Sequence, residues 1–325
     1  MQRNDRPFDP HWFLKNRYVQ TILASNRIRL VGKKNMISCA EEKILDAGGG
    51  IRLQGFISHP RSSQSKGLVI LIHGWEGSAM STYIVSTGEY LFNRGYTIFR
   101  LNLRDHGDSH HLNEGFFWAI LLDEVFEAVK QAAQMTSMNA FLAGFSLGGN
   151  FALRIAKKCA EHPIKNLQHV VAVSPGLNPD QSTDAIDNDF LLRYYFIKKW
   201  RNSLRKKQEL FPHRYRFGDL LTTNSVRKMT EKIISRYGAY ADVLTYFSGY
   251  TLTGDALKDI CLPTTIITSA DDPIIPIDDF YRLVLPSCVR LIVHQFGGHN
   301  GFVESIPFRC WYEQKIDAIA NGYVN

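Results

Sequence analysis

The 325-residue sequence contains no apolar run that approaches the roughly 20 residues needed to cross a bilayer. Its first residues are polar, and no apolar signal-peptide core follows them. The five cysteines are widely scattered and include no C-x-x-C pair. Such cysteines are typical of free thiols in a reducing compartment rather than of a disulfide framework or a zinc site. These absences argue against a membrane-spanning or disulfide-rich protein, and we expect a cytoplasmic location.

One segment accounts for the net positive charge of the chain. The chain carries a formal net charge of +7, from 38 Lys and Arg against 31 Asp and Glu. Residues 190–217 hold nine of the basic residues and one acidic residue, so the rest of the chain sums to −1 (29 basic minus 30 acidic). Binding of nucleic acid would depend on that one patch alone, and we expect no nucleic-acid partner.

Strand-like and helix-like segments alternate along most of the chain. The strand-like segments are 37–45, 51–57, 67–72, 97–103, 139–143, 170–173, 264–268 and 289–293. The helix-like segments are 81–93, 118–132, 150–159, 278–285 and a last one from Phe302 onward. This alternation predicts an α/β fold with a mostly parallel sheet and helices on both faces.

Two segments fall outside this alternation. Residues 1–35 contain aromatic residues such as Phe8 and Trp12, and we expect an N-terminal arm that lies on the body of the protein. Between about residues 176 and 257 the sequence becomes aromatic and basic, with helical spacing in parts. We expect an inserted helical cap there, within a single domain that spans residues 1–325.

The most informative motif is the glycine-flanked serine of Gly144-Phe145-Ser146-Leu147-Gly148, which joins a strand-like run to a helix-like one. In this setting a sharp turn lifts the serine hydroxyl clear of the sheet, and the glycines let neighbouring backbone pass close to it. A structural turn can have the same composition, so the motif needs partners elsewhere. A catalytic serine requires a base and an orienting acid, because its hydroxyl is a poor nucleophile at neutral pH.

Candidates for the acid and the base follow in the chain. Asp271 and Asp272 come after the strand-like segment 264–268, and His299 follows the last strand in a Gly-rich loop. Both sites lie just past the carboxyl ends of strands, where open α/β sheets place their functional groups. We prefer Asp272 because it directly precedes a Pro-x-x-Pro turn, and Asp271 stays the alternative. The order Ser, Asp, His predicts a triad of Ser146, Asp272 and His299.

Acyl transfer also needs hydrogen-bond donors for the oxyanion, which in this fold are two backbone N–H groups. We expect them from Leu147 and from Trp75, which lies in the loop His73–Gly77. His73 itself is expected to brace that loop. Residues 104–111 are dense in His and Asp, but their spacing matches no standard zinc pattern and a serine hydrolase needs no metal. We therefore predict no metal and no other cofactor.

Together these residues resemble the α/β-hydrolase superfamily and, more narrowly, the YheT-like branch of esterases. The narrower resemblance rests on Arg17–Ile22, which is similar to an H-x-Q-T segment of that branch, and on four further motifs: His73–Ser78, Gly144–Asn150, Asp271–Pro273 and Gly297–Phe302. Tyr18 stands where the branch often has histidine. The resemblance implies an α/β-hydrolase fold and a carboxylic-ester hydrolase of short to medium acyl chains.

The predicted chemistry is cleavage of a small-molecule ester, lipid-like esters included, through an acyl-enzyme on Ser146. An acyltransferase or a thioesterase on the same scaffold is the alternative. If the cap excludes water, an alcohol rather than water accepts the acyl group. In residues 190–217 we expect the aromatic side chains to line the pocket and the Lys and Arg side chains to stay solvated. These cations also suggest peripheral contact with an anionic membrane, to which each adds about 1 kcal/mol. The sequence specifies no oligomeric state.

Overall fold

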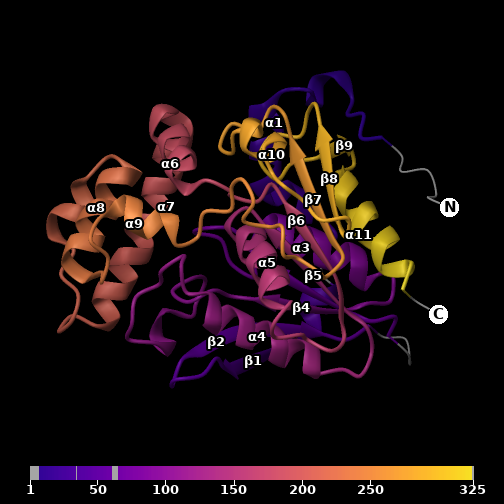
Figure 1. The fold of residues 1–325 in the computed structure, drawn as a ribbon, viewed down its shortest axis with the longest axis horizontal. Helices are drawn as coiled ribbons and strands as arrows, with labels where there is room; N and C mark the ends of the chain where they lie inside the picture. The colour runs from indigo at the N-terminus through magenta and orange to yellow at the C-terminus, as the bar shows by residue number, and fades with distance from the viewer. Residues whose placement is uncertain (1–6, 34, 61–64, 324–325) are drawn as a thin grey trace.

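A central β-sheet organises the molecule (Figure 1). The structure is a computed structural model that describes residues 7–33, 35–60 and 65–323, and within these ranges eight strands form the sheet in the order β1-β2-β4-β3-β5-β6-β7-β8. The strands are β1 (Glu41–Asp46), β2 (Arg52–Ser58), β3 (Leu68–Ile72), β4 (Thr97–Leu101), β5 (Ala140–Phe145), β6 (Leu167–Val173), β7 (Thr264–Ser269) and β8 (Val289–His294). Strand β2 is antiparallel to β1 and β4, and the other pairs are parallel. The predicted α/β fold class is confirmed.

Helices cover both faces of this sheet. Helices α3 (Thr82–Phe92) and α11 (Trp311–Asn321) pack on one face, and α4 (Leu122–Gln134) and α5 (Leu147–Lys158) pack on the other. Side chains of β3 alternate between the two layers: Leu68, Ile70 and Ile72 join the α4–α5 side, whereas Val69 and Leu71 join the α3–α11 side. All five are fully buried, which explains why this strand is a continuous apolar run.

The register of the parallel strands brings separate loops together. Ile72, the last residue of β3, pairs with Leu101 in β4 and with Gly144 in β5. Parallel strands end at the same edge of a sheet, so the loops that follow them are neighbours. The loop His73–Gly77 after β3 therefore lies beside the turn that follows β5.

Four α-helices lie between β6 and β7 in the described part of the chain, and they form a separate layer beside the sheet (Figure 1). They are α6 (Pro179–Asn188), α7 (Phe190–Leu210), α8 (Val226–Tyr237) and α9 (Val243–Ser248), and we call residues 179–248 the cap. The Asp187 carboxylate ties the cap together, because it accepts hydrogen bonds from the backbone N–H groups of Val226 and Arg227. Within the described residues, no helix is long and apolar enough to span a membrane, the 21-residue α7 included.

The N-terminal segment lies along the body as short helical turns. They are η1 (Trp12–Leu14), α1 (Arg17–Ser25), η2 (Arg27–Leu30) and α2 (Asn35–Ser38). Residues 1–6 and 34 of the expected arm lie outside the described residues. The buried Gln20 side chain joins α1 to the C-terminal part: its Nε2 donates to the carbonyls of Leu14 (2.8 Å) and Val303 (3.0 Å), and its Oε1 accepts from Val303 N (2.8 Å). The amide thus satisfies three backbone groups that would otherwise be buried without partners.

Several expected elements are wrong at their boundaries. The helix expected from Phe302 onward begins only at Trp311, and the strands β9 (Val303–Ser305) and β10 (Arg309–Cys310) precede it. Two constraints explain this: Gln20 binds the backbone of Val303 as a neighbouring strand would, and Pro307 cannot continue a helix. The expected strand 37–45 is instead α2 followed by β1, the helix expected at 118–132 begins at Leu122, and the helix expected at 278–285 is the shorter α10 (Ile277–Tyr281).

Candidate active site

Ser146 lies at the tight turn between β5 and α5 with a strained backbone. Its φ of 54° and ψ of −117° fall in a region that residues with a side chain rarely adopt. The flanking glycines are required sterically, because a Cβ at Gly144 would collide with the carbonyl of Gly148, and one at Gly148 would collide with the carbonyl of Ile72. The turn therefore presents the hydroxyl of Ser146 above the carboxyl edge of the sheet.

A continuous chain of hydrogen bonds joins Ser146, His299 and Asp272. His299 Nε2 lies 2.9 Å from Ser146 Oγ, and His299 Nδ1 lies 2.9 Å from Asp272 Oδ2 and 3.2 Å from Oδ1. Because the carboxylate accepts a hydrogen bond from Nδ1–H, Nε2 is left to accept one from the serine hydroxyl. The buried Asp272 side chain is itself held by the backbone N–H groups of Ile274 (2.8 Å) and Ile275 (3.0 Å). This is the arrangement in which a histidine can take the serine proton.

Asp271 has a different position. Its Oδ1 accepts a hydrogen bond from the backbone N–H of Gly298 at 2.9 Å, one residue before the histidine. Burial raises the pKa of its carboxyl above the ordinary value. Asp272 thus contacts the imidazole of His299, whereas Asp271 contacts the loop that carries His299.

The loop after β3 runs directly against Ser146. A Cβ at Gly74 would lie 3.0 Å from Ser146 Cβ and 3.5 Å from its Oγ, so only glycine leaves room for this approach. Within the described residues, the backbone N–H groups of Trp75 and Leu147 donate no hydrogen bond. Leu147 is also the first residue of α5, where the helix dipole favours negative charge. Both expected donors are therefore unengaged beside the serine.

His73 holds this loop in place by hydrogen bonds to backbone groups. Its Nδ1 lies 2.7 Å from the carbonyl of Gly74, and its Nε2 accepts from the backbone N–H of Leu103 at 3.2 Å. Burial lowers the pKa of this imidazole well below its ordinary value, so the ring is neutral. Both nitrogens of this neutral ring are hydrogen bonded to backbone groups. His73 therefore holds the backbone in position, and it has no free nitrogen to serve as a base.

The polar loop after β4 holds the cap. Asp105 accepts from Lys207 Nζ of α7 at 2.7 Å and from Phe117 N at 2.8 Å, and His110 Nε2 lies 2.8 Å from Ser203 Oγ of α7. Among the described residues, no group of three or more His, Cys, Asp and Glu side chains could hold a metal ion. Asp105, Asp108 and His110 of this loop therefore contact α7, whereas His106 Nδ1 lies 2.7 Å from the carbonyl of Arg104 within the loop itself.

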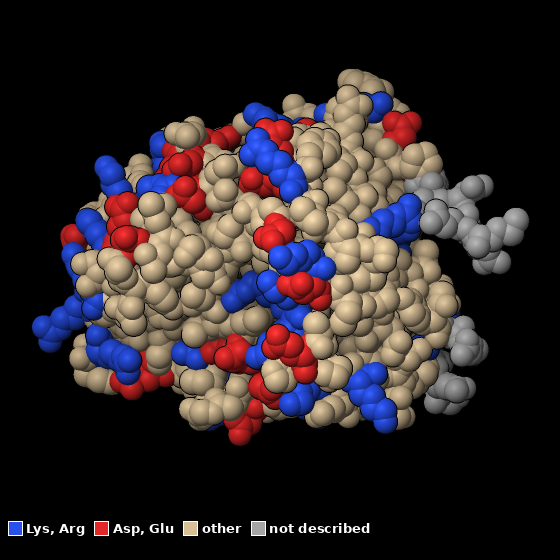
Figure 2. Space-filling view, viewed as in Figure 1, with Lys and Arg blue, Asp and Glu red and all other residues tan. Residues whose placement is uncertain are grey.

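Lys207 departs from the expectation that the basic residues of the cap stay solvated. The Lys207 side chain is 1% exposed and the Asp105 side chain 5% exposed. A buried ion pair is retained only when its remaining groups are hydrogen bonded, and the ammonium also donates to the carbonyls of Asn113 (2.6 Å) and Gly115 (3.1 Å). On the face shown in Figure 2, basic and acidic side chains lie side by side over the cap. The cap therefore shows no uniformly basic surface on that face.

Thr21 is a site residue that the sequence reasoning missed. Its Oγ1 accepts the backbone N–H of His299 at 2.9 Å and donates to the carbonyl of Arg17 at 2.7 Å. On the other side of the loop, Ser269 Oγ donates to the carbonyl of Gly298 at 2.9 Å. The signal available in the sequence was the Arg17–Ile22 motif itself, for which no function had been assigned.

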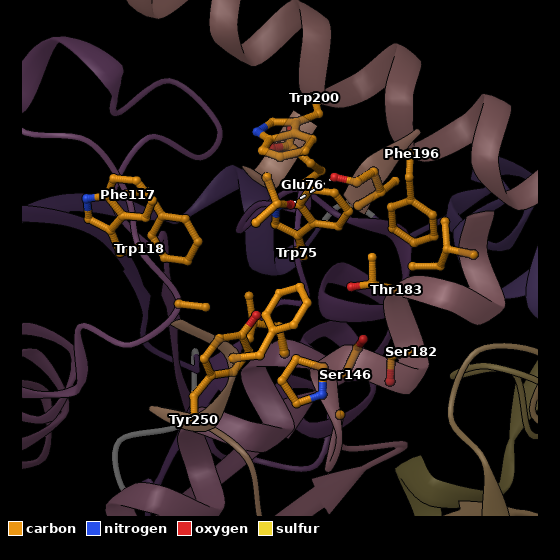
Figure 3. A pocket seen from close by; sticks show the side chains of 18 of the residues that line it. Trp75, Glu76, Phe117, Trp118, Ser146, Ser182, Thr183, Phe196, Trp200 and Tyr250 are labelled. Atoms are coloured by element: carbon orange, nitrogen blue, oxygen red, sulfur yellow. Dashed lines mark hydrogen bonds between the residues drawn. The ribbon is translucent and has the colours of Figure 1, made fainter. Parts of the chain in front are cut away.

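Ser146 lies where two cavities meet. The inner cavity, of about 150 Å³, lies under the cap and is lined mainly by apolar side chains (Figure 3). Trp75 stacks on Phe196 (ring centroids 5.4 Å apart) and contacts Trp200 edge-on (5.0 Å), so α7 closes one side of it. The outer groove, of about 660 Å³, lies between α1, the loop before α3 and α7, and it reaches both Ser146 and His299.

Glu76 brings a carboxyl group into the inner cavity. It follows Trp75 in the loop after β3, has a φ of 54°, and lines the cavity beside Trp200 (Figure 3). Burial raises the pKa of this carboxyl to about 8, although the charge of Lys199 acts in the opposite direction. At neutral pH the group is therefore mainly protonated and adds no charge to the apolar cavity.

Comparison with known proteins assigns the class. The family described as alpha/beta hydrolase fold matches residues 67–306, and the chain belongs to that family. Among solved structures, an esterase of Pyrococcus furiosus, Pf2001, superimposes with a TM-score of 0.55 at 17% identity, covering 88% of this chain and 92% of the other. That likeness shows the same fold.

The branch follows from the sequence relatives. The chain is 23% identical over 301 residues to phospholipase ABHD3 of Bos taurus, and the matched region covers 88% of this chain and 72% of the relative. It is 24% identical over 271 residues to YheT of Escherichia coli K12, an esterase by name, covering 79% of this chain and 77% of the relative. The resemblance stated from the motifs is confirmed: this is an ester hydrolase of the YheT-like branch.

Thr21→Val tests whether α1 positions the histidine. The substitution removes the acceptor for His299 N at nearly constant volume, so we expect kcat to fall about 10- to 100-fold, the scale of a small misplacement of a catalytic group. KM should change less than kcat, because the groove keeps its shape. Thr21→Ser keeps the hydroxyl and should restore most of the activity. Equal losses in both variants would contradict the assignment.

Glu76→Gln tests the titration of the half-buried carboxyl in the inner cavity. The pKa of Glu76 is about 8 in the folded protein against an ordinary value of 4.5, so the carboxyl's contribution to stability declines as the pH rises from 4.5 to 8. The neutral amide avoids this loss, and Glu76→Gln should raise Tm more at pH 8.5 than at pH 5. Glu161→Gln, at an exposed position, is the control. An equal change at both pH values for Glu76→Gln would contradict the raised pKa.

Proposed function

We propose that this ester hydrolase acts through an acyl-enzyme on Ser146, with His299 as the base and Asp272 as the orienting acid. The observation that carries the proposal is the hydrogen-bond chain from Ser146 Oγ through the imidazole to the Asp272 carboxylate. The strained backbone of Ser146 supports it further, because strain of this kind gathers at functional sites.

The reaction has two half-reactions. As Ser146 Oγ attacks the ester carbonyl, its proton moves to His299 Nε2, and the N–H groups of Trp75 and Leu147 stabilise the oxyanion. The tetrahedral intermediate then expels the alcohol, which takes the proton from His299. A water molecule then attacks the acyl-enzyme and gives a proton to Nε2. The second tetrahedral intermediate expels Ser146 Oγ, which takes that proton back from Nε2, and the carboxylic acid leaves. Asp272 keeps its charge throughout and stabilises the imidazolium.

The two cavities suggest which end of the ester lies where. The inner cavity is small and mainly apolar, which suits an acyl chain of short to medium length. The outer groove is larger and reaches the solvent-exposed rim, which suits the alcohol part. The relatives named esterase and phospholipase support a carboxylic ester, lipid-like esters included.

Hydrolysis of p-nitrophenyl esters of increasing acyl length tests the function and measures the inner cavity. We expect kcat/KM to be highest for short to medium chains and to fall once the chain exceeds the cavity. Ser146→Ala should abolish turnover while leaving the far-ultraviolet circular dichroism and Tm nearly unchanged, because only the hydroxyl oxygen is lost. A folded Ser146→Ala variant with full activity would overturn the mechanism.

Asparagine substitutions at the two neighbouring aspartates test the choice of acid. Asp272→Asn should lower kcat by about 10⁴-fold, the loss known for a triad aspartate, because the amide no longer holds the imidazole in the required tautomer. Asp271→Asn removes only a loop contact and should cost far less. If the two effects are reversed, the acid is Asp271.

A further inference from the structure

The first two turns of α7 are apolar on the side that faces solvent. Phe190, Leu191, Tyr194 and Tyr195 are between 40% and 70% exposed. The opposite side of the same turns is apolar too and faces the protein, with Leu192 buried. Arg193 is the one charged residue among residues 190–197, and a helix segment that is apolar on nearly every side is normally covered. The exposed side of these turns therefore needs a covering surface that the monomer lacks in its described residues.

These side chains border the outer groove. Leu191 and Tyr195 line it from α7, Ile22 lines it from α1, and Met80 lines it from the loop before α3. Ile22 is 57% exposed and Met80 50% exposed. We call these four residues the apolar rim. Single exposed apolar residues are ordinary, but a group from three separate segments around one opening marks an interaction site.

The charged side chains that line this groove have one sign. Of the described residues that line the groove, Arg27 and Lys199 are cationic, and none is Asp or Glu. Lys198 and Lys199 lie over the rings of Tyr194 (5.9 Å) and Tyr195 (5.0 Å). Tyrosines beside lysines are typical of the headgroup level of a bilayer, where one part of the side chain is apolar and the other is hydrated.

We propose that the apolar rim docks on the surface of an anionic lipid bilayer, with the outer groove opening toward the lipid. The proposal rests on the proposed function in one respect, because the ester drawn from the bilayer is the substrate of Ser146. The docking surface consists of the first half of α7, α1 and the loop before α3, and it does not include the whole basic segment 190–217. In the second half of that segment, Lys206 and Lys207 are paired with Asp108 and Asp105.

A lipid surface fits this opening better than a second copy of the chain. In a two-fold symmetric contact, the apolar rims of two copies would face each other, so Arg27 and Lys199 of one copy would approach Arg27 and Lys199 of the other. Like charges brought together in an apolar contact are unfavourable. Phosphate-bearing headgroups instead complement the cations, while the apolar rim enters the boundary between headgroups and acyl chains.

Co-sedimentation with vesicles tests the proposal. The full chain carrying Ser146→Ala is used, so that binding is measured without hydrolysis, with vesicles of phosphatidylcholine alone or with 30% phosphatidylglycerol. We expect binding to the anionic vesicles that weakens at high salt. Adding Leu191→Glu should weaken it about tenfold or more, because membrane binding depends on buried apolar area and on charge. Leu244→Glu is the matched control, since Leu244 is 59% exposed and Leu191 60% exposed.

Three results would overturn the docking surface. The first is no binding of the Ser146→Ala protein to anionic vesicles, and the second is equal loss in Leu191→Glu and Leu244→Glu. The third is self-association that Leu191→Glu abolishes without any vesicle binding, which would assign the rim to a second copy. Esterase activity of the unmodified chain on soluble esters is measured separately, so failure of the docking surface and failure of the proposed function are distinguishable.

Discussion

The close approach of two backbone segments is the constraint on which the site depends. The end of β3 and the start of α5 lie so near each other that Gly148 has no room for a Cβ beside the carbonyl of Ile72. This contact forces the turn at Ser146 into its strained conformation. It also brings the loop that carries Trp75 next to the turn that carries Leu147, the two residues from which we expect the oxyanion donors. The proposed nucleophile and its expected oxyanion donors therefore depend on one packing contact.

The histidine is held by a different set of contacts, and these come from distant parts of the chain. Thr21 binds the backbone of His299 across 278 residues of sequence, Asp271 binds Gly298, and Ser174 accepts from Asn300 N at 3.3 Å. Each bond is modest by itself, but a base must lie within hydrogen-bond reach of its nucleophile to act. The N-terminal helix α1 is thus part of the site's support.

The features that the sequence predicted are those with local signals. The strands of the sheet are continuous apolar runs, and Ser146, Asp272 and His299 follow strand ends in a fixed order, so their proximity followed from the topology. The histidine's support could not be predicted, because Thr21 is an ordinary threonine until the fold brings it to the loop. The helix expected at Phe302 failed for the same reason, since the side chain of Gln20 determines the extended backbone there.

Different parts of helix α7 line the inner cavity, border the outer groove and attach the cap to the body. Its inward residues close the inner cavity against Trp75, its first turns border the outer groove, and its second half is fixed to the body by the Lys207–Asp105 pair. Separating that pair without full hydration would leave two poorly solvated charges, which costs several kcal/mol. The second half of α7 is therefore held in place, and opening of the cap at that end is disfavoured. Access to Ser146 is then expected through the outer groove, where the apolar rim lies.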